Sequence, residues 1–279
     1  MTSYAFIDGA ALLSFIEEAG RTLSPSEAPR IDYTKIFNHI AYSGWSNTFA
    51  DRLFFYDAYP SKRNSENEGE FDTRWNETDA LFKTLSRIPQ VHVRTGVTTR
   101  HRKKVGVVQK GVDVLLAIEA FRHAQSGNIE EATLVLSDLD FLPLLDALTQ
   151  TRVRTNLVYV PKKTNDLLIE AADYARPIGL KEFLLWCVDS EFRAQFNIED
   201  AGIASSQTWQ DKEVAIIPGY GEALFGKMSV TKGVSTFGVQ APRLLAQSTL
   251  VCQSKDMLIE HIERKAGAQL KVEKNKLQE

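Results

Sequence analysis

The segment TLVLSDLDFLPLL, residues 133–145, indicates how this chain folds. Its apolar first half is typical of a buried strand, and Asp138 and Asp140 follow that strand directly. A buried carboxylate is costly unless it is paired or coordinated, so these acids either face water at the end of the strand or hold a cation. The residues after Asp140 have helical spacing, so the segment predicts a strand, an acidic turn and a helix.

Similar pairs of strand and helix recur along the first two thirds of the chain. The predicted strands cover residues 4–7, 50–60, 90–100, 130–138 and 154–161. The predicted helices cover residues 10–20, 32–44, 75–89, 110–128, 140–151 and 165–175, with Asn76 as the expected cap of the third. Short, almost wholly apolar strands that alternate with helices predict an α/β fold, in which a parallel sheet is sandwiched by helices.

The composition changes near residue 190, where Gly, Ser and Thr become frequent. We therefore expect two domains, residues 1–186 and a smaller β-rich module of residues 190–279 that ends in a charged, helical tail. Within this module, GEALFGKM (221–228) comes close to a phosphate-binding loop. Met228 replaces the hydroxyl that such a loop needs and Glu222 would repel a phosphate, so we expect a glycine-rich turn instead.

Charge and cysteine content restrict the classes of function. The net charge of −3 does not indicate a polyanionic partner for the molecule as a whole. Cys187 and Cys252 have no metal-binding spacing, which is typical of reduced thiols in the cytoplasm. No signal peptide and no apolar run of about 20 residues is visible, so we expect no membrane association.

Four acids are the candidates for chemistry: Asp8, Asp113, Asp138 and Asp140. Asp8 and Asp138 end predicted strands and Asp113 begins a predicted helix, and parallel α/β sheets bind ligands beyond the carboxyl ends of their strands. Clustered carboxylates suit a hard cation such as Mg²⁺ or Mn²⁺. Three of these acids also have a purely structural interpretation: Asp8 in an Asp-Gly turn, Asp113 as a first-turn acid, and Asp140 as a helix cap.

A basic segment lies next to Asp113. Residues 80–112 contain no Asp or Glu, although the chain is acidic overall. Cations beside an acidic site suit a phosphodiester chain, whereas the alternative is a solvated basic loop. The residues that we expect to bind nucleic acid are Arg100, Arg102, Lys103, Lys104 and Lys110.

Three motifs in order, FIDGAAL (6–12), KGVDVLLAIEA (110–120) and LVLSDLDFLPLL (134–145), resemble the NYN family of PIN-like ribonucleases, which includes the LabA-type proteins. The resemblance covers roughly residues 4–186. It implies a PIN-like fold and a metal-dependent ribonuclease that cleaves RNA with acids matching the four aspartates. It also implies that Asp8, Asp113 and Asp138 bind Mg²⁺ or Mn²⁺, and that Asp140 is a further ligand or orients water.

The chain departs from the family pattern at small polar positions. Ala11 stands where the family usually has Asn, Ser137 replaces Gly and Leu139 replaces Ser. Glu119 matches a position that is often acidic in the family. On a helix it lies about 240° round from Asp113, so we expect a supporting, structural role for it.

Two other functions compete with a ribonuclease. The losses at Ala11 and Leu139 are compatible with a catalytically weak or inactive RNA-binding protein of the same fold. LVLSDLDF also resembles the strand and DxD motif of haloacid-dehalogenase-like phosphatases, although Leu142 stands where that family has Thr or Val and Asp8 would have no role. We expect the C-terminal module to serve homo-oligomerisation or substrate choice.

Overall fold

The computed structural model describes residues 1–96, 111–200, 209–228, 236–246 and 248–273. The chain divides into two compact units. The first unit consists of Met1–Glu18 and Asp32–Ile178, and the second of Ala19–Ile31 and Gly179–Glu279.

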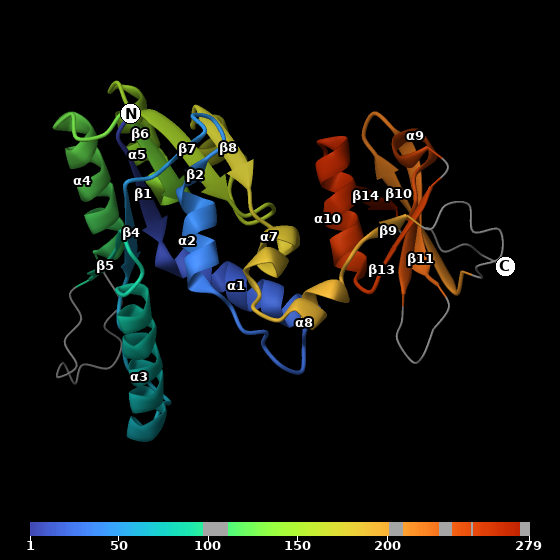
Figure 1. The fold of residues 1–279 in the computed structure, drawn as a ribbon, viewed down its shortest axis with the longest axis horizontal. Helices are drawn as coiled ribbons and strands as arrows, with labels where there is room; N and C mark the ends of the chain where they lie inside the picture. The colour runs from blue at the N-terminus through green and yellow to red at the C-terminus, as the bar shows by residue number, and fades with distance from the viewer. Residues whose placement is uncertain (97–110, 201–208, 229–235, 247, 274–279) are drawn as a thin grey trace. The chain divides into compact units, whose positions relative to one another are not determined.

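A six-stranded sheet forms the centre of the first unit, and all of its neighbouring strands pair in parallel (Figure 1). The strand order is β5-β4-β1-β6-β7-β8. The order reverses direction at β1, which pairs with β4 on one side and β6 on the other. The strands are β1 (Ser3–Asp8), β4 (Arg52–Asp57), β5 (Val91–Thr95), β6 (Glu131–Val135), β7 (Arg154–Tyr159) and β8 (Tyr174–Pro177). A separate hairpin pairs β2 (Tyr42–Ser43) with β3 (Thr48–Phe49).

Helices cover both faces of this sheet. The helical elements of the first unit, with α1 continuing into the second, are α1 (Gly9–Leu23), α2 (Tyr33–Ala41), α3 (Glu68–Leu85), α4 (Val112–Gln125), η1 (Leu139–Phe141), α5 (Leu142–Thr149) and α6 (Asp166–Glu170). On one face, buried residues of α4, α5 and α6 form a core with alternate strand residues such as Phe6 and Phe54. On the other face, Phe37 of α2 and Phe82 of α3 contact the ring of Phe55, at centroid distances of 6.2 and 6.4 Å.

Two expectations for this unit need correction. Helix α3 begins at Glu68 instead of near Trp75, because Asn67 and Glu70 form a capping box in which each side chain accepts the other's backbone N–H. Asn76 therefore lies inside the helix and is not its cap. The predicted helix over residues 165–175 ends at Glu170, and the chain then forms the edge strand β8.

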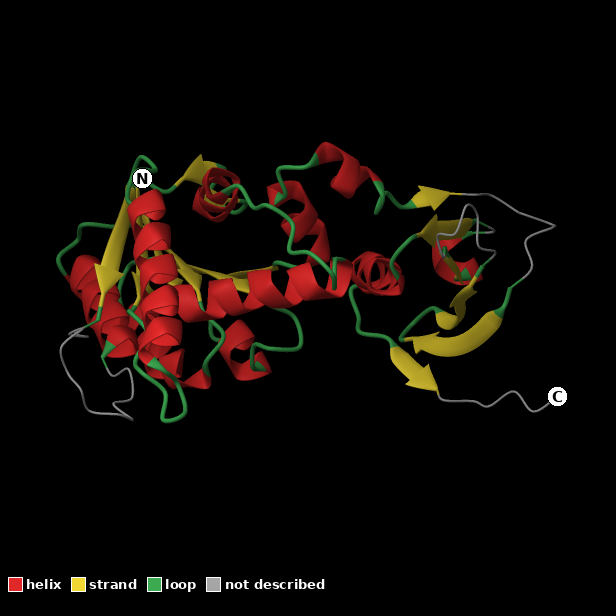
Figure 2. Ribbon diagram, turned by 90° about the horizontal axis from the view of Figure 1, so that it is seen from below, coloured by secondary structure: helices red, strands yellow, loops and turns green. Residues whose placement is uncertain are grey.

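The second unit contains an antiparallel sheet, and strands prevail in its C-terminal part (Figure 2). The strands, in the order β14-β10-β11-β12-β13-β9, are β9 (Glu199–Asp200), β10 (Asp211–Ile217), β11 (Gly221–Lys227), β12 (Phe237–Gln240), β13 (Thr249–Cys252) and β14 (Lys271–Glu273). Its further helices are α7 (Leu180–Trp186), α8 (Ser190–Ala194), α9 (Pro242–Leu245) and α10 (Lys255–Ala266).

The predicted fold class is confirmed: a helix-covered parallel sheet is followed by a β-rich C-terminal part. Residues 221–227, expected as a turn, instead form β11, which pairs along its length with β10. This strand excludes a phosphate-binding loop at that position, because such a loop needs its backbone N–H groups free. None of the helices in the described part of the chain has the length and apolar character needed to cross a membrane.

Candidate functional site

Asp8 is the last residue of β1, the strand at which the sheet order reverses. The residue is only 9% exposed. One carboxylate oxygen accepts hydrogen bonds from the backbone N–H groups of Ala10 (3.0 Å) and Ala11 (3.3 Å) at the start of α1. A carboxylate in this position satisfies N–H groups that a helix leaves free in its first turn. The structural role of Asp8 is therefore to cap α1 and not to start a separate Asp-Gly turn, because the helix already begins at Gly9. This cap lies at the point where parallel α/β sheets bind ligands.

The electrostatic environment of Asp8 disfavours its charged form. Burial raises the pKa of Asp8 to about 6, and the negative charges of Asp113 and Asp57 add to this shift against the opposing effect of the Ala10 and Ala11 amides. The backbone hydrogen bonds therefore do not fully compensate the buried charge, and a bound cation would relieve it.

Asp113 lies in the first turn of α4 and is exposed. Gly111 precedes this helix with φ of 105°, a left-handed conformation that side-chain-bearing residues rarely adopt. Partial desolvation raises the pKa of Asp113, and the charges of Asp138 and Asp140 raise it further. Asp113 is therefore electrostatically coupled both to Asp8 and to the acids that follow β6.

Asp138 and Asp140 are both exposed on the short turn between β6 and α5. The Asp138 carboxylate accepts the backbone N–H of Asp140 at 3.0 Å and caps the turn η1. The capping role expected for Asp140 thus belongs to Asp138, because Leu139–Phe141 form a separate 3₁₀ turn before α5 begins at Leu142. Asp140 donates its backbone N–H to that cap, so its own carboxylate is not the capping group.

The fold brings the four predicted acids to the carboxyl edge of the sheet from three separate segments. Their oxygen donors are of the type that Mg²⁺ and Mn²⁺ prefer, and the mutual repulsion acting on Asp113 is what a cation would offset. Within the described ranges, however, no three Asp, Glu, His or Cys side chains form a group that could hold a metal ion. The donor chemistry fits a divalent cation, whereas the spacing of the described side chains does not outline a coordination sphere.

Asp57 is an acid of this edge that the sequence reasoning missed. It ends β4, and its charge contributes to the raised pKa of Asp8. Its carboxylate accepts the backbone N–H of Ala58 at 2.7 Å. The sequence contained a signal for it, because RLFFYD (52–57) is an apolar strand that ends in Asp, as YAFID (4–8) does.

Glu119 does not belong to the acidic edge. Its carboxylate accepts the Tyr56 hydroxyl at 2.7 Å and pairs with Arg94 at 3.3 Å. Tyr56 is fully buried, so Glu119 satisfies a core hydroxyl. This contact agrees with the structural role that we expected for Glu119 from its position on the helix, on a different face from Asp113. The five predicted nucleic-acid-binding residues lie outside the described residues: Arg100, Arg102, Lys103, Lys104 and Lys110.

A parallel sheet with acids at its switch point defines an α/β protein that binds its ligand at the carboxyl edge of the sheet. The family model of the NYN domain matches residues 6–179, and this chain belongs to the NYN domain family. The NYN domain places it in the PIN-like nuclease superfamily, whose members generally use divalent metals. The match therefore favours a nuclease-type protein over a haloacid-dehalogenase-like phosphatase.

Comparison with curated proteins found no match. A crystal structure of a protein of unknown function from Vibrio parahaemolyticus RIMD 2210633 is similar, with 16% sequence identity and a TM-score of 0.43. The similarity covers 63% of this chain and 93% of the Vibrio chain.

Proposed function

We propose that this protein is a metal-dependent ribonuclease whose nuclease domain spans residues 1–186. The observation that carries the proposal is the electrostatic coupling of Asp8 with Asp113, and of Asp113 with Asp138 and Asp140, at the switch point of an NYN-family sheet. Carboxylates that raise each other's pKa at one edge of a sheet are typical of a functional site.

Within this proposal, Asp8, Asp113 and Asp138 bind Mg²⁺ or Mn²⁺, and Asp140 is a further ligand or orients the attacking water. A divalent ion held by these residues would polarise the phosphate and lower the pKa of a bound water. The chain's own contribution is positional, because the amides of Ala10 and Ala11 hold the Asp8 carboxylate and the Asp140 amide holds Asp138. Fixed carboxylates cost little reorganisation when the substrate arrives.

The substrate in this proposal is RNA, single-stranded or structured, and residues 190–279 form an accessory module for homo-oligomerisation or substrate choice. The basic residues that hold the phosphate backbone are Arg100, Arg102, Lys103, Lys104 and Lys110. Cys187 and Cys252 are both buried thiols outside any disulfide bond, and the proposal places the protein in the cytoplasm, where thiols stay reduced.

The test is cleavage of labelled single-stranded and structured RNA with Mn²⁺, with Mg²⁺ and with EDTA. Asp138→Asn keeps the oxygen that caps η1 but loses its charge, so it should fold and fail to cleave. Asp146→Asn, an exposed aspartate of α5, is the matched control and should cleave like the wild type. Equal cleavage by the wild type and Asp138→Asn would reveal a contaminating nuclease and contradict the proposal.

A second candidate is an RNA-binding protein that keeps the fold without turnover. The replacements at Ala11 and Leu139 favour it, as does the lack of a three-donor metal group among the described side chains. RNA binding that weakens with salt, without cleavage under any metal condition, would identify this function.

A further inference from the structure

A cavity of about 330 Å³ lies beside Asp57 at the carboxyl edge of the parallel sheet. Its walls come from the start of α1, the loop between β4 and α3, and one side of α3. Leu13 and Leu81 contribute apolar surface, and Arg63 and Arg74 contribute cationic groups. Ligand pockets typically have volumes of about 300–1,000 Å³, so this cavity is large enough for a small group such as one nucleotide.

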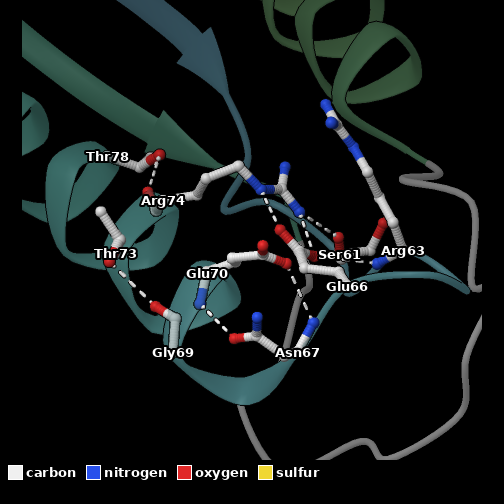
Figure 3. A network of polar contacts seen from close by, with 9 residues as sticks. All are labelled: Ser61, Arg63, Glu66, Asn67, Gly69, Glu70, Thr73, Arg74 and Thr78. Atoms are coloured by element: carbon white, nitrogen blue, oxygen red, sulfur yellow. Dashed lines mark hydrogen bonds and ion pairs between the residues drawn. The ribbon is translucent and has the colours of Figure 1, made fainter.

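The wall that carries Arg74 is held by an ion pair between Arg74 and Glu66 (Figure 3). The guanidinium donates to both carboxylate oxygens, at 2.6 and 2.7 Å, and also to the carbonyl of Ser61 at 2.9 Å. The hydrogen bonds from Arg74 lower the pKa of Glu66 to about 2, so this pair stays ionised. The charge of Arg74 is therefore largely neutralised, and its role is to fix the loop.

Arg63 differs from Arg74 because its side chain acts on Glu66 only through its charge, and this charge contributes less to the lowered pKa of Glu66 than the hydrogen bonds from Arg74 do. Its backbone N–H donates to Glu66 at 3.0 Å, which holds its main chain in place. Its side chain is exposed, and among the described residues the guanidinium forms no hydrogen bond. Figure 3 shows it directed away from the Glu66–Arg74 pair. Arg63 is thus a cation at the rim of the cavity whose guanidinium donates no hydrogen bond to the described residues.

We propose that this cavity binds one nucleotide of the RNA chain, adjacent to the phosphate cleaved at the acidic edge, and that Arg63 holds the phosphate of that nucleotide. The proposal rests on the ribonuclease function proposed above. Acids such as Asp8 and Asp57 repel the phosphodiester backbone, so a flanking cation is needed to retain the chain. A guanidinium matches phosphate oxygens in a planar, two-point geometry.

The test compares Arg63→Gln with Arg152→Gln in the full chain. Arg152 is exposed and precedes β7, so it carries the same charge at the opposite, amino edge of the sheet. Cleavage of a labelled single-stranded RNA oligonucleotide gives KM and kcat. Binding of the same oligonucleotide to Asp138→Asn, with and without Arg63→Gln, gives the affinity over a range of KCl concentrations.

We expect Arg63→Gln to raise KM about tenfold with kcat nearly unchanged, because one charge-assisted contact is lost. The plot of log affinity against log salt should become less steep by about 0.7, the value for one phosphate contact on a single strand. Arg152→Gln should change neither quantity.

Three results would overturn this inference, and they can be told apart. Normal cleavage with unchanged KM in Arg63→Gln would refute the nucleotide site and leave the ribonuclease standing. Equal losses in Arg63→Gln and Arg152→Gln would show a general charge effect without a site. No cleavage and no RNA binding by the wild type would refute the ribonuclease itself.

Discussion

Gly9 lies so close to Asp57 that a β-carbon on Gly9 would stand 2.8 Å from the β-carbon of Asp57. The same added atom would stand 2.6 Å from the ring of Phe55 and 2.8 Å from the carbonyl oxygen of Tyr56. The first residue of α1 is therefore pressed against the end of β4. This approach brings Asp8 and Asp57, from separate strands, to one edge of the sheet.

Gly9→Ala should lower the free energy of unfolding by about 2–3 kcal/mol, because neither the backbone nor the packed ring can yield easily. Gly20→Ala, on the same helix, is the control. The nearest atoms to its added β-carbon are at 3.6 and 3.7 Å, so alanine should be neutral or stabilise by up to about 1 kcal/mol. Urea denaturation of both variants measures the difference, and equal stabilities would contradict the close packing.

Asp8→Asn should make the metal-free protein more stable at neutral pH. The pKa of Asp8 is about 6 in the folded protein against an ordinary 3.8, so the folded state binds more protons than the unfolded state between these values. The free energy of unfolding of the wild type should then fall as the pH rises from 4 to 6. Asparagine keeps an oxygen for Ala10 and Ala11 but cannot ionise, and should gain about 1–3 kcal/mol at pH 7.

This prediction is checked by urea denaturation in EDTA between pH 4 and pH 7. The wild-type and Asp8→Asn curves should diverge as the pH rises, whereas exposed Asp146→Asn should follow the wild type. Parallel curves for Asp8→Asn and the wild type would show that the charge of Asp8 is not destabilised by burial. Addition of Mn²⁺ should raise the melting temperature of the wild type and leave that of Asp8→Asn unchanged.

Two acids on helix α4 should respond differently to neutralisation. Asp113→Asn should reduce the rate of cleavage by about 100-fold or more, because Asp113 is one of the proposed metal ligands and its pKa is raised by the charges of Asp138 and Asp140. Glu119→Gln should keep its cleavage activity, because glutamine can still accept the hydroxyl of Tyr56. Cleavage rates in Mn²⁺ provide the measurement, and similar losses in the two variants would contradict the separation of their roles.

The alternation of strands and helices could be predicted because each parallel strand is buried on both faces and is therefore a compact apolar run. The start of α3 could not be predicted this way, because its first turns are polar and the capping box of Asn67 and Glu70 lies within what looks like a loop. Strand β8 could not be predicted either. It is a short edge strand whose four residues are only half-buried, so it has no apolar run.

The acids could be proposed from sequence because Asp8 and Asp138 follow strands, and strand ends meet in a parallel sheet. The cavity beside Asp57 could not be predicted from the sequence. Arg63 and Arg74 lie in a polar stretch where charged residues are common, and what distinguishes them is that the Arg74 guanidinium donates hydrogen bonds to Glu66. That distinction depends on tertiary contacts that the spacing of the residues does not encode.

Glu66→Gln should weaken the protein chiefly above pH 4.5. The pKa of Glu66 is lowered from its ordinary 4.5 to about 2, so its stabilising effect is fully present above pH 4.5 and is lost as the pH falls through 2. The difference in the free energy of unfolding between wild type and Glu66→Gln should therefore shrink over this range. Glu68→Gln is the control, because Glu68 is 81% exposed. A difference that stays constant from pH 6 to pH 2 would contradict the pairing.

Helix α1 has a consequence for how this protein can be divided or recombined. It begins beside Asp8 in the first compact unit and continues into the second, to which Ala19–Ile31 belong. Ala19 and Leu23 are buried, and Arg30 accepts a hydrogen bond from the backbone of Val188. Cutting the chain after Ile178 would therefore separate residues 19–31, including the buried Ala19 and Leu23, from the rest of the second unit. The second unit therefore cannot be replaced by exchanging the C-terminal residues alone. A chimera made from two related proteins would have to exchange residues 19–31 together with residues 179–279.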